Sequence, residues 1–284
     1  MKHTEAKLLG PGQRSIYCQW WAPEAAPKAI LLLVHGAGEH SGRYLHVAEF
    51  FVGQGLAVSA LDHRGHGHSD GKPGHIDVFD DYLVDLAVFH NEVVRQFPGV
   101  PIFLLGHSLG GLIACNYLLQ QQDRFVGCIL SGALIKSDLQ PGWVQMGVIR
   151  LLALLAPRLG LMQLDASGVS RDPEEVKKYV EDPLVLHGKA SARMVRELFA
   201  GMATLQADAA GIRLPMLMLH GDADVLTSPD GSRYLHQHIS STDKTLIIYP
   251  GLYHEILNEP EGQDVLDQIL SWCEARLPAN GSCI

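Results

Sequence analysis

The stretch PIFLLGHSLGGLIACNYLL, residues 101–119, decides how this chain is expected to fold. It begins with a short apolar run typical of a buried strand, and its apolar residues from Leu109 onward have helical spacing. Gly106-His107-Ser108-Leu109-Gly110 lies between the two and fits the G-x-S-x-G pattern of a sharp strand-to-helix turn. A buried serine in an ordinary glycine turn is the alternative. The flanking strand and helix favour an exposed, nucleophilic Ser108.

Similar apolar runs recur along the chain and alternate with helical segments. The expected strands cover residues 29–34, 55–61, 101–106, 125–130, 215–220 and 244–249. The expected helices cover residues 78–96, 109–121 and 262–276. Strands that are apolar along their whole length are covered on both faces. The alternation therefore predicts an α/β fold with a doubly wound, mostly parallel sheet, and residues 1–23 add a hairpin around Gly10-Pro11-Gly12.

The alternation is interrupted once, between Ser131 and Ile212. This segment of roughly 80 residues has helical patterning and no strand signal. Within it, Asp172-Pro173-Glu174-Glu175 is a helix start, with Asp as N-cap and Pro at the first helical position. We interpret the segment as an inserted helical cap. The domain organisation is then core (1–131), cap (132–211) and core again (212–284).

A serine hydroxyl needs a general base, and the base needs an acid that orients it. Two loops follow expected strands: GDADVLTSP at 221–229 and PGLYHE at 250–255. His254 is the natural base because it stands at the carboxyl end of the last strand. The acid is Asp222 or Asp224. Spacing after the turn glycine favours Asp224 and leaves Asp222 to order the loop.

The glycine-rich stretch VHGAGEHSGRY, residues 34–44, is the expected second half of an oxyanion hole. The N–H groups of Ala37 and Leu109 are the candidate donors. Glu39 and Arg43 lie in the same loop, where they either hydrogen-bond the polar end of a substrate or pair with each other to hold the loop. We favour the pairing, because a fixed loop is needed to aim the amide of Ala37.

The composition narrows the classes of function. With 47% hydrophobic residues the chain can bury a sizeable core, and its net charge of −9 without a basic block makes nucleic acid an unlikely partner. The start lacks the apolar run of a secretory signal, and no run is long enough to span a bilayer. We expect a reduced, cytoplasmic location from an odd set of scattered cysteines. They are Cys18, Cys115, Cys128, Cys273 and Cys283.

The histidine-rich loop DHRGHGHSDGKPGH covers residues 62–75. It has the residue spacing of neither a metal site nor a phosphate loop. Its histidines alternate with glycines and lack the i, i+4 helical spacing that brings two ligands together. The Gly-x-x-x-x-Gly-Lys pattern is also missing. We therefore expect no metal. We interpret the loop as a turn that passes under the active site and is fixed by an Asp62–Arg64 pair.

Several of these stretches together resemble the monoacylglycerol lipase family of α/β-hydrolases. They are HGAGEHSGRY, DHRGHGHSDG, GHSLGG, SRDPEEVKKYVEDPLV and the two triad loops, over residues 15–276. The resemblance implies a serine hydrolase that cleaves monoacylglycerols to fatty acid and glycerol through an acyl-enzyme on Ser108, without metal or other cofactor. Ser108, Asp224 and His254 match the family's triad, and Ala37 and Leu109 match its oxyanion donors.

Two departures from the family leave details of the acyl pocket and of thiol sensitivity open. Leu109 stands where animal members commonly have Met, and Thr227 stands where some have Cys. A carboxylesterase, a lysophospholipase or an acyl-thioesterase would use the same triad. A non-catalytic lipid-binding module is a further alternative, which the intact triad argues against.

The most apolar part of the expected cap is GWVQMGVIRLLALLAPRLGLMQL, residues 142–164. We expect a helix here whose apolar face lines an acyl tunnel, because no other segment offers comparable apolar material. Its outer side either dips into lipid as a peripheral membrane contact or packs on the core.

Overall fold

The computed structural model describes residues 1–137 and 142–277, and in this part of the chain the main sheet has the strand order β1-β2-β4-β3-β5-β6-β9-β10. Strands β1 and β2 form an antiparallel hairpin, β2 is antiparallel to β4, and all later pairs are parallel. The strands are Lys2–Leu9, Ser15–Ala22, Ile30–Val34, Ala57–Leu61, Ile102–His107, Gly127–Ser131, Met216–Gly221 and Lys244–Tyr249 (β1–β6, β9 and β10). The predicted mostly parallel sheet and its N-terminal hairpin are confirmed.

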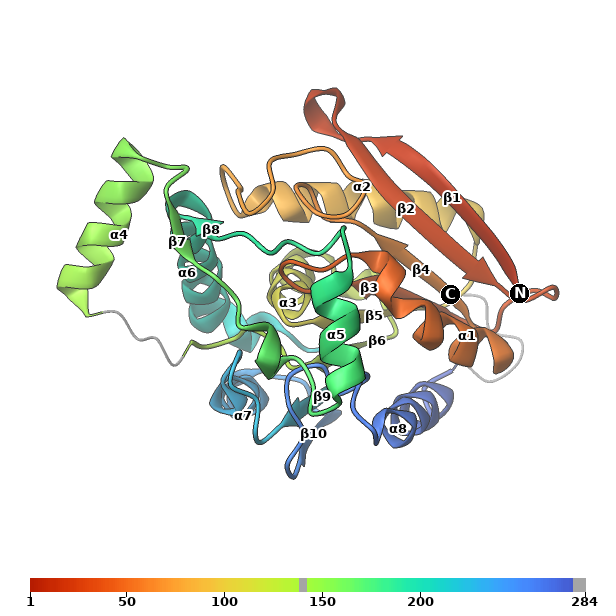
Figure 1. The fold of residues 1–284 in the computed structure, drawn as a ribbon. Coiled ribbons are helices and arrows are strands. Elements are labelled where there is room, and N and C mark those ends of the chain that lie inside the picture. The colour runs from red at the N-terminus through yellow and green to blue at the C-terminus, as the bar shows by residue number, and fades with distance from the viewer. Residues whose placement is uncertain (138–141, 278–284) are drawn as a thin grey trace.

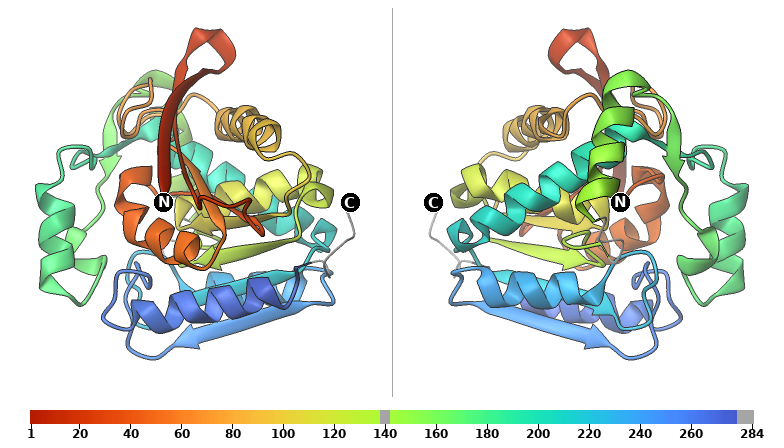
Figure 2. Two further views of the ribbon diagram at one scale, coloured as in Figure 1. Left: turned by 90° about the vertical axis from the view of Figure 1, so that its right-hand side faces the viewer. Right: turned by 90° about the vertical axis from the view of Figure 1, so that its left-hand side faces the viewer.

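Helices cover both faces of this sheet (Figures 1 and 2). On one face lie α1 (Leu45–Gly53) and α8 (Gly262–Glu274), and on the other lie α2 (Asp80–Gln96), α3 (Leu109–Gln121), α6 (Ala192–Asp208) and α7 (Pro229–His238). Successive strand residues serve the two faces in turn: in β3, Leu31 and Leu33 pack with α1 and α8, whereas Leu32 packs with α2 and α3. The apolar strands are thus buried on both faces, as their composition predicts.

The inserted segment between β6 and β9 has its own small elements. They are α4 (Trp143–Leu155), β7 (Gly160–Met162), α5 (Pro173–Glu181) and β8 (Ala190–Ser191), followed by α6. Helix α5 begins as predicted, with Asp172 accepting a hydrogen bond from the Glu174 amide and Pro173 at the first position. The expectation of a segment without strands is wrong, because β7 and β8 pair with each other. Strands of three and two residues are too short to leave a periodic signal.

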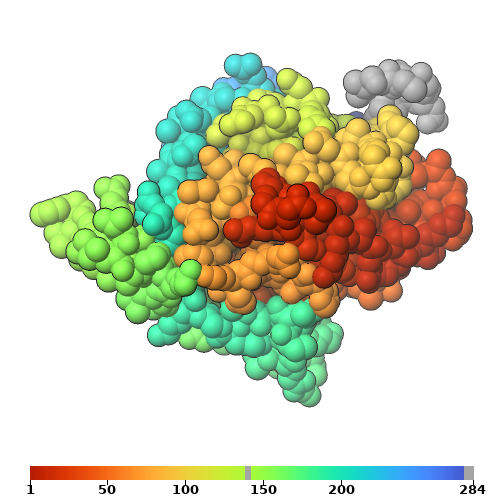
Figure 3. All heavy atoms as spheres, turned by 90° about the horizontal axis from the view of Figure 1, so that it is seen from above, coloured from red at the N-terminus to blue at the C-terminus, as the bar shows by residue number. Residues whose placement is uncertain are grey.

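Helix α4 projects from one side of the molecule (Figures 1 and 3). It packs against α6, which in turn packs on α3 of the core. Ala153 is buried, but Trp143 is 88% exposed and Leu155 is 73% exposed. Of the described residues, no helix is long and apolar enough to cross a membrane.

The histidine-rich loop after β4 is built as a close-packed turn. A side chain on Gly65, whose φ is +74°, would collide with the carbonyl oxygen of Lys72. The expected Asp62–Arg64 pair is wrong. Arg64 instead forms a two-pronged pair with Asp85 of α2, at 2.6 and 2.7 Å, and a further contact of 2.8 Å with Asp81.

Asp62 and Arg64 do not pair because each has other partners. Asp62 accepts hydrogen bonds from the backbone of its own loop and its neighbour, through the amides of Ser41 and His68, both at 2.8 Å. Asp81 and Asp85 lie one turn apart on the helix above Arg64, and only the tertiary fold brings them there.

Candidate active site

Ser108 occupies a strained position between β5 and α3. Its backbone angles, φ +52° and ψ −118°, lie outside the regions that side-chain-bearing residues ordinarily adopt. Two glycines make the turn possible: a Cβ on Gly106 would lie 2.6 Å from the Gly110 carbonyl oxygen, and one on Gly110 would collide with the Val34 carbonyl oxygen. The geometry is therefore that of the predicted nucleophile turn.

His254 and Asp224 meet at the carboxyl edge of the sheet, as the two loops after β9 and β10 predict. The Nδ1 atom of His254 is 2.7 Å from Oδ2 of Asp224, and both side chains are buried. Burial by itself lowers the pKa of His254, but the adjacent Asp224 carboxylate outweighs it and the net pKa is raised. The same pairing holds the pKa of Asp224 well below its usual range, although burial opposes it.

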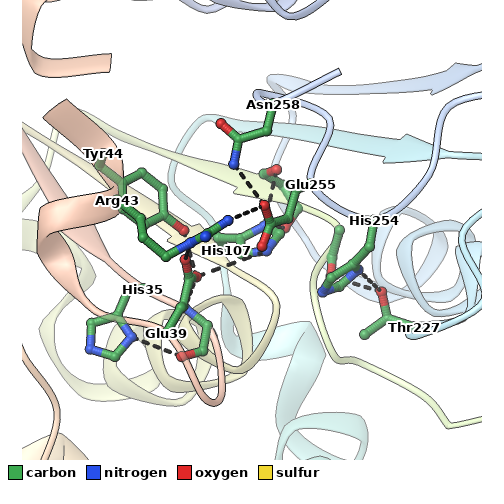
Figure 4. Close-up of polar contacts among 12 residues, drawn as sticks. His35, Glu39, Arg43, Tyr44, His107, Thr227, His254, Glu255 and Asn258 are labelled. Atoms are coloured by element: carbon green, nitrogen blue, oxygen red, sulfur yellow. Dashed lines mark hydrogen bonds and ion pairs between the residues drawn. The ribbon is translucent and has the colours of Figure 1, made fainter. Parts of the chain in front are cut away.

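Two further side chains hold the Asp224 carboxylate, and the sequence reasoning missed the role of both. The Thr227 hydroxyl lies 2.8 Å from Oδ2 of Asp224 and 3.2 Å from Nδ1 of His254, and Nε2 of His220 lies 3.1 Å from the same Oδ2 (Figure 4 shows the Thr227–His254 contact). On the other side of the imidazole, Nδ1 of His220 is 2.8 Å from the Ser232 hydroxyl. His220 precedes the turn glycine of the acid loop, and that position is the sequence signal that could have pointed to it.

The second carboxylate of this loop, Asp222, has a different environment. It is exposed and accepts a hydrogen bond of 2.6 Å from the Gly251 amide, which ties the acid loop to the loop that carries the histidine. Oδ1 of Asp224, by contrast, accepts from the amides of Leu226 and Thr227 at 2.8 and 2.9 Å. The arrangement is consistent with Asp224 as the acid and Asp222 as the residue that orders the loop.

The two expected oxyanion donors, Ala37 and Leu109, belong to segments that meet at Ser108. Leu109 begins α3, where the first amides of the helix have no partner inside the helix, and Ala37 lines the same small pocket as Ser108. Neither amide is engaged by another group of the described residues. A Cβ on the neighbouring Gly36 would come within 3.0 Å of the Ser108 Cβ, which shows how closely this loop passes Ser108.

Glu39 and Arg43 are part of a buried ionic group beside the pocket (Figure 4). Nε of Arg43 is 3.5 Å from Glu39, and Nη2 of Arg43 is 2.6 Å from Oε2 of Glu255. Glu39 also accepts hydrogen bonds from the Gly36 amide at 2.5 Å and the Tyr44 hydroxyl at 2.7 Å. The two residues therefore contact each other and brace the loop, the alternative that the sequence analysis favours.

The pocket at Ser108 is small, enclosing about 20 Å³. Its lining residues are Gly36, Ala37, Glu39, His107, Ser108, Leu164, Val169, Tyr179, Leu226, His254 and Glu255. The expectation that the helix within 142–164 lines an acyl tunnel at the serine is wrong: of that stretch, Leu164 reaches the pocket. Helix α4 instead borders a separate cavity of about 530 Å³ with α6, because the chain turns into β7 soon after Pro157.

Buried histidines surround the site and are used as hydrogen-bonding groups. Nε2 of His35 accepts from the His63 amide at 2.9 Å, and Nε2 of His63 donates to the His35 carbonyl at 3.0 Å. Burial and the neighbouring His66 lower the pKa of His63 to about 3, and burial with the neighbouring His254 lowers that of His107 to about 3. Within the described residues, no group of three or more side chains is placed to hold a metal ion.

The cysteines stand apart from this chemistry. The four that the structure describes are free and buried, and burial raises the pKa of the Cys273 thiol to about 12. Cys283 lies outside the described residues. A thiol with a raised pKa is a poor nucleophile, so the described cysteines are not candidates for a reactive role.

Comparison with known proteins gives consistent matches over almost the whole chain. A protein-family model described as serine aminopeptidase, S33, matches residues 25–261. A monoacylglycerol lipase of Mycolicibacterium smegmatis is 39% identical over 274 residues, covering 96% of this chain and 98% of that protein. A monoglyceride lipase of Rattus norvegicus is 34% identical over 278 residues, covering 97% of this chain and 92% of that protein. The crystal structure of a Paleococcus ferrophilus monoacylglycerol lipase superposes with a TM-score of 0.81 at 33% identity, covering 92% of this chain and 99% of that one.

Proposed function

The chain belongs to the monoacylglycerol lipase family of α/β-hydrolases, and we propose that it cleaves monoacylglycerols to a fatty acid and glycerol with Ser108, His254 and Asp224 as its triad. It is a carboxylic ester hydrolase. The observation that carries the proposal is that His254, which is 2.7 Å from the buried Asp224 carboxylate, lines the same small pocket as Ser108 at its strained strand-to-helix turn.

The proposed mechanism is acyl transfer in two steps. His254 takes the proton of the Ser108 hydroxyl as its oxygen attacks the ester carbonyl, and the amides of Ala37 and Leu109 stabilise the resulting oxyanion. His254 then gives the proton to the departing glycerol oxygen, leaving the fatty acyl group on Ser108. Water attacks this ester with His254 again acting as base, which releases the fatty acid and restores the serine.

Residues 132–211 are proposed to act as the cap over this site. Three residues of this segment, Leu164, Val169 and Tyr179, line the pocket together with Ser108 and His254. A pocket of about 20 Å³ is too small for an acyl chain, so the cap must move outward when substrate enters. Small shifts of these side chains would open the apolar side of the pocket.

We propose a lipid surface as the contact partner of helix α4. Its exposed apolar side chains are Trp143, Val144, Val148, Leu151, Leu154 and Leu155. An exposed apolar helix face of this kind, with Arg150 and Arg158 at its flanks, suits the boundary between head groups and acyl chains. The contact would be peripheral, and it would bring the entrance of the site towards its water-insoluble substrate.

Two measurements test the proposed activity. A fluorophosphonate probe should label Ser108 in the folded protein. A lack of labelling would point to a non-catalytic binding module. A hydrolysis panel of mono-, di- and triacylglycerols of graded chain length, with lysophospholipid and acyl-CoA as comparisons, should show monoacylglycerols cleaved fastest. A faster lysophospholipid or thioester reaction would overturn the assigned substrate while leaving the triad intact.

A further inference from the structure

The lining of the pocket at Ser108 includes both apolar and acidic side chains. Leu164, Val169 and Leu226 are apolar, whereas Glu39 and Glu255 bring carboxylates. In the proposed reaction His254 must reach the oxygen of the leaving alcohol. Glu255 follows His254 directly in the chain and lines the same pocket. We place the leaving alcohol near the two glutamates, because the acyl chain takes up the apolar part of the lining.

These two carboxylates share one guanidinium group. Arg43 contacts Glu255 at 2.6 Å and Glu39 at 3.5 Å, and it lies over the ring of Tyr179 with its central carbon 4.7 Å from the ring centre. Glu39 is 3% exposed and Glu255 is 5% exposed. The remaining hydrogen bonds to these carboxylates come from uncharged groups, including the Asn258 amide at 2.7 Å from Glu255. Two negative charges thus stand against one positive charge, in a place where water screens them poorly.

We propose that the Glu39–Arg43–Glu255 group selects esters with an uncharged leaving alcohol, and that Glu255 excludes those whose alcohol carries a phosphate. This inference rests on the proposed function, because it concerns the alcohol side of the same reaction. A glycerol hydroxyl can donate a hydrogen bond to a carboxylate. A fully ionised phosphate group has only acceptors. It cannot donate a hydrogen bond to the carboxylates, and their net negative charge repels it.

Arg43 does not offer a phosphate site in this arrangement. Binding of phosphate by arginine is strongest when two guanidinium N–H groups point at the ligand. In this structure Nη2 is hydrogen-bonded to Glu255, Nε lies 3.5 Å from Glu39 without a hydrogen bond, and the guanidinium lies against Tyr179. A phosphate would have to displace a carboxylate that is itself buried, which leaves that charge unpaired.

The test compares soluble hexanoyl esters that differ only in the alcohol: monohexanoylglycerol, its phosphate ester (hexanoylglycerol phosphate) and methyl hexanoate. The full chain should cleave the glycerol ester at least about a hundredfold faster, in kcat/KM, than the phosphate ester. Glu255→Gln keeps the side-chain shape and removes the charge, and it should reduce that ratio about tenfold. The rate on methyl hexanoate, whose alcohol carries no polar group, measures any general loss of activity in the variant, so that a change of the ratio can be assigned to the alcohol. All rates are taken at a pH where activity no longer changes, so that His254 is neutral in every variant.

Glu197→Gln is the matched control. Glu197 is a buried glutamate, 6% exposed, beside Arg196 and hydrogen-bonded to the Phe79 amide, and it lies outside the pocket at Ser108. This variant should leave the ratio unchanged. The proposal is overturned if the unmodified protein cleaves the phosphate ester as fast as the glycerol ester, or if the ratio is unchanged in a folded Glu255→Gln variant.

Failure of the underlying activity has a different signature. If the proposed function is wrong, the unmodified protein leaves monohexanoylglycerol intact even though a fluorophosphonate probe labels Ser108. If Glu255→Gln does not fold, equal rates of the unmodified protein on the two glycerol esters would still overturn the proposal. Glu39→Gln, which removes the other negative charge of the group and leaves Arg43 paired with Glu255, then replaces Glu255→Gln and should show the same reduced ratio.

Discussion

The loops around Asp224 and the helix α4 are opposites in how their side chains are accommodated. The Asp224 carboxylate is fully buried and both of its oxygens accept hydrogen bonds from neighbouring groups. Helix α4 keeps one residue, Ala153, buried and exposes six large apolar side chains. The first region is arranged to hold charge at fixed distances, and the second presents apolar surface that the described chain leaves uncovered. Catalysis and access to lipid are therefore expected to respond to different substitutions.

The largest effect is expected at Ser108, the proposed nucleophile. Ser108→Ala should lower kcat by roughly five orders of magnitude while the free energy of unfolding stays nearly unchanged. Ser108→Gly should be equally inactive but more stable by about 1 kcal/mol, because glycine tolerates a φ of +52°. Ester hydrolysis and urea denaturation measure the two quantities. An active Ser108→Ala variant would remove the serine from the mechanism.

The two aspartates of the acid loop should differ sharply. Asp224→Asn is expected to lower kcat by about 10⁴-fold, because the imidazole loses both its orienting acceptor and the charge that stabilises the imidazolium. Asp222→Asn keeps an oxygen for the Gly251 amide and should change kcat by less than about threefold. Both variants replace one carboxylate oxygen with an NH₂ group, at positions two residues apart in the same loop. Each is therefore a control for the other. Greater loss in Asp222→Asn would exchange their roles.

The donors behind Asp224 should have an intermediate effect. His220→Leu removes one hydrogen bond to the carboxylate and should lower kcat about ten- to a hundredfold, with little change in KM. His220→Gln retains a donor and should recover part of the loss. His90→Leu is the matched control, since His90 is also fully buried but is hydrogen-bonded to Tyr117. If the His90 and His220 variants lost equal activity, a general effect of buried histidine loss would explain both.

The pH dependence follows from the raised pKa of His254. Activity needs the neutral imidazole, so kcat/KM should fall as pH drops through a value above the ordinary histidine pKa of about 6.5. In Asp224→Asn the residual activity should persist to lower pH, because burial then acts on His254 without an opposing charge. The pH–rate profiles of the two proteins measure this shift. An acid limb at the same pH in both would contradict the coupling.

The same pKa directions have consequences for stability. The pKa of Asp224 is lowered by folding, so its contribution to stability is present above its unfolded pKa and is lost as pH falls towards the folded value. The pKa of His254 is raised, so its contribution is present below its unfolded pKa and is lost as pH rises through the folded value. Urea denaturation of the unmodified protein should show the first loss at acidic pH, below the unfolded pKa of Asp224. It should show the second as pH rises through the folded pKa of His254.

The smallest effect on chemistry is expected at α4. The triple variant Trp143→Ser/Leu154→Ser/Leu155→Ser should change hydrolysis of a soluble ester by less than about twofold, because these side chains lie outside the pocket. Sedimentation with liposomes should fall strongly, since each apolar side chain that enters lipid contributes about 1.5–3 kcal/mol. Leu9→Ser, an exposed leucine on β1, is the control. Equal sedimentation of all three proteins would remove the proposed membrane contact.

Much of the fold could be predicted because its elements are local patterns. Apolar runs bounded by turn residues marked the strands of the core, and Asp172-Pro173 marked the start of α5, since both signals depend on neighbours in the chain. The short strands β7 and β8 were not predicted, because the pairing between Gly160 and Ser191 exists only after the chain has folded back. The candidate triad was predictable for a similar reason: each member lies in the turn or loop that follows a recognisable strand.

What the sequence by itself determined is the set of elements, the sharp turn at Ser108 and the loops that carry Asp224 and His254, because spacing and turn chemistry act over a few residues. The tertiary structure alone decided the partners of the buried charges. Arg64 pairs with Asp85 of α2 rather than with Asp62, and Arg43 joins Glu39 to Glu255, more than 200 residues away. Such contacts depend on which segments packing brings together, and packing is a property of the whole chain.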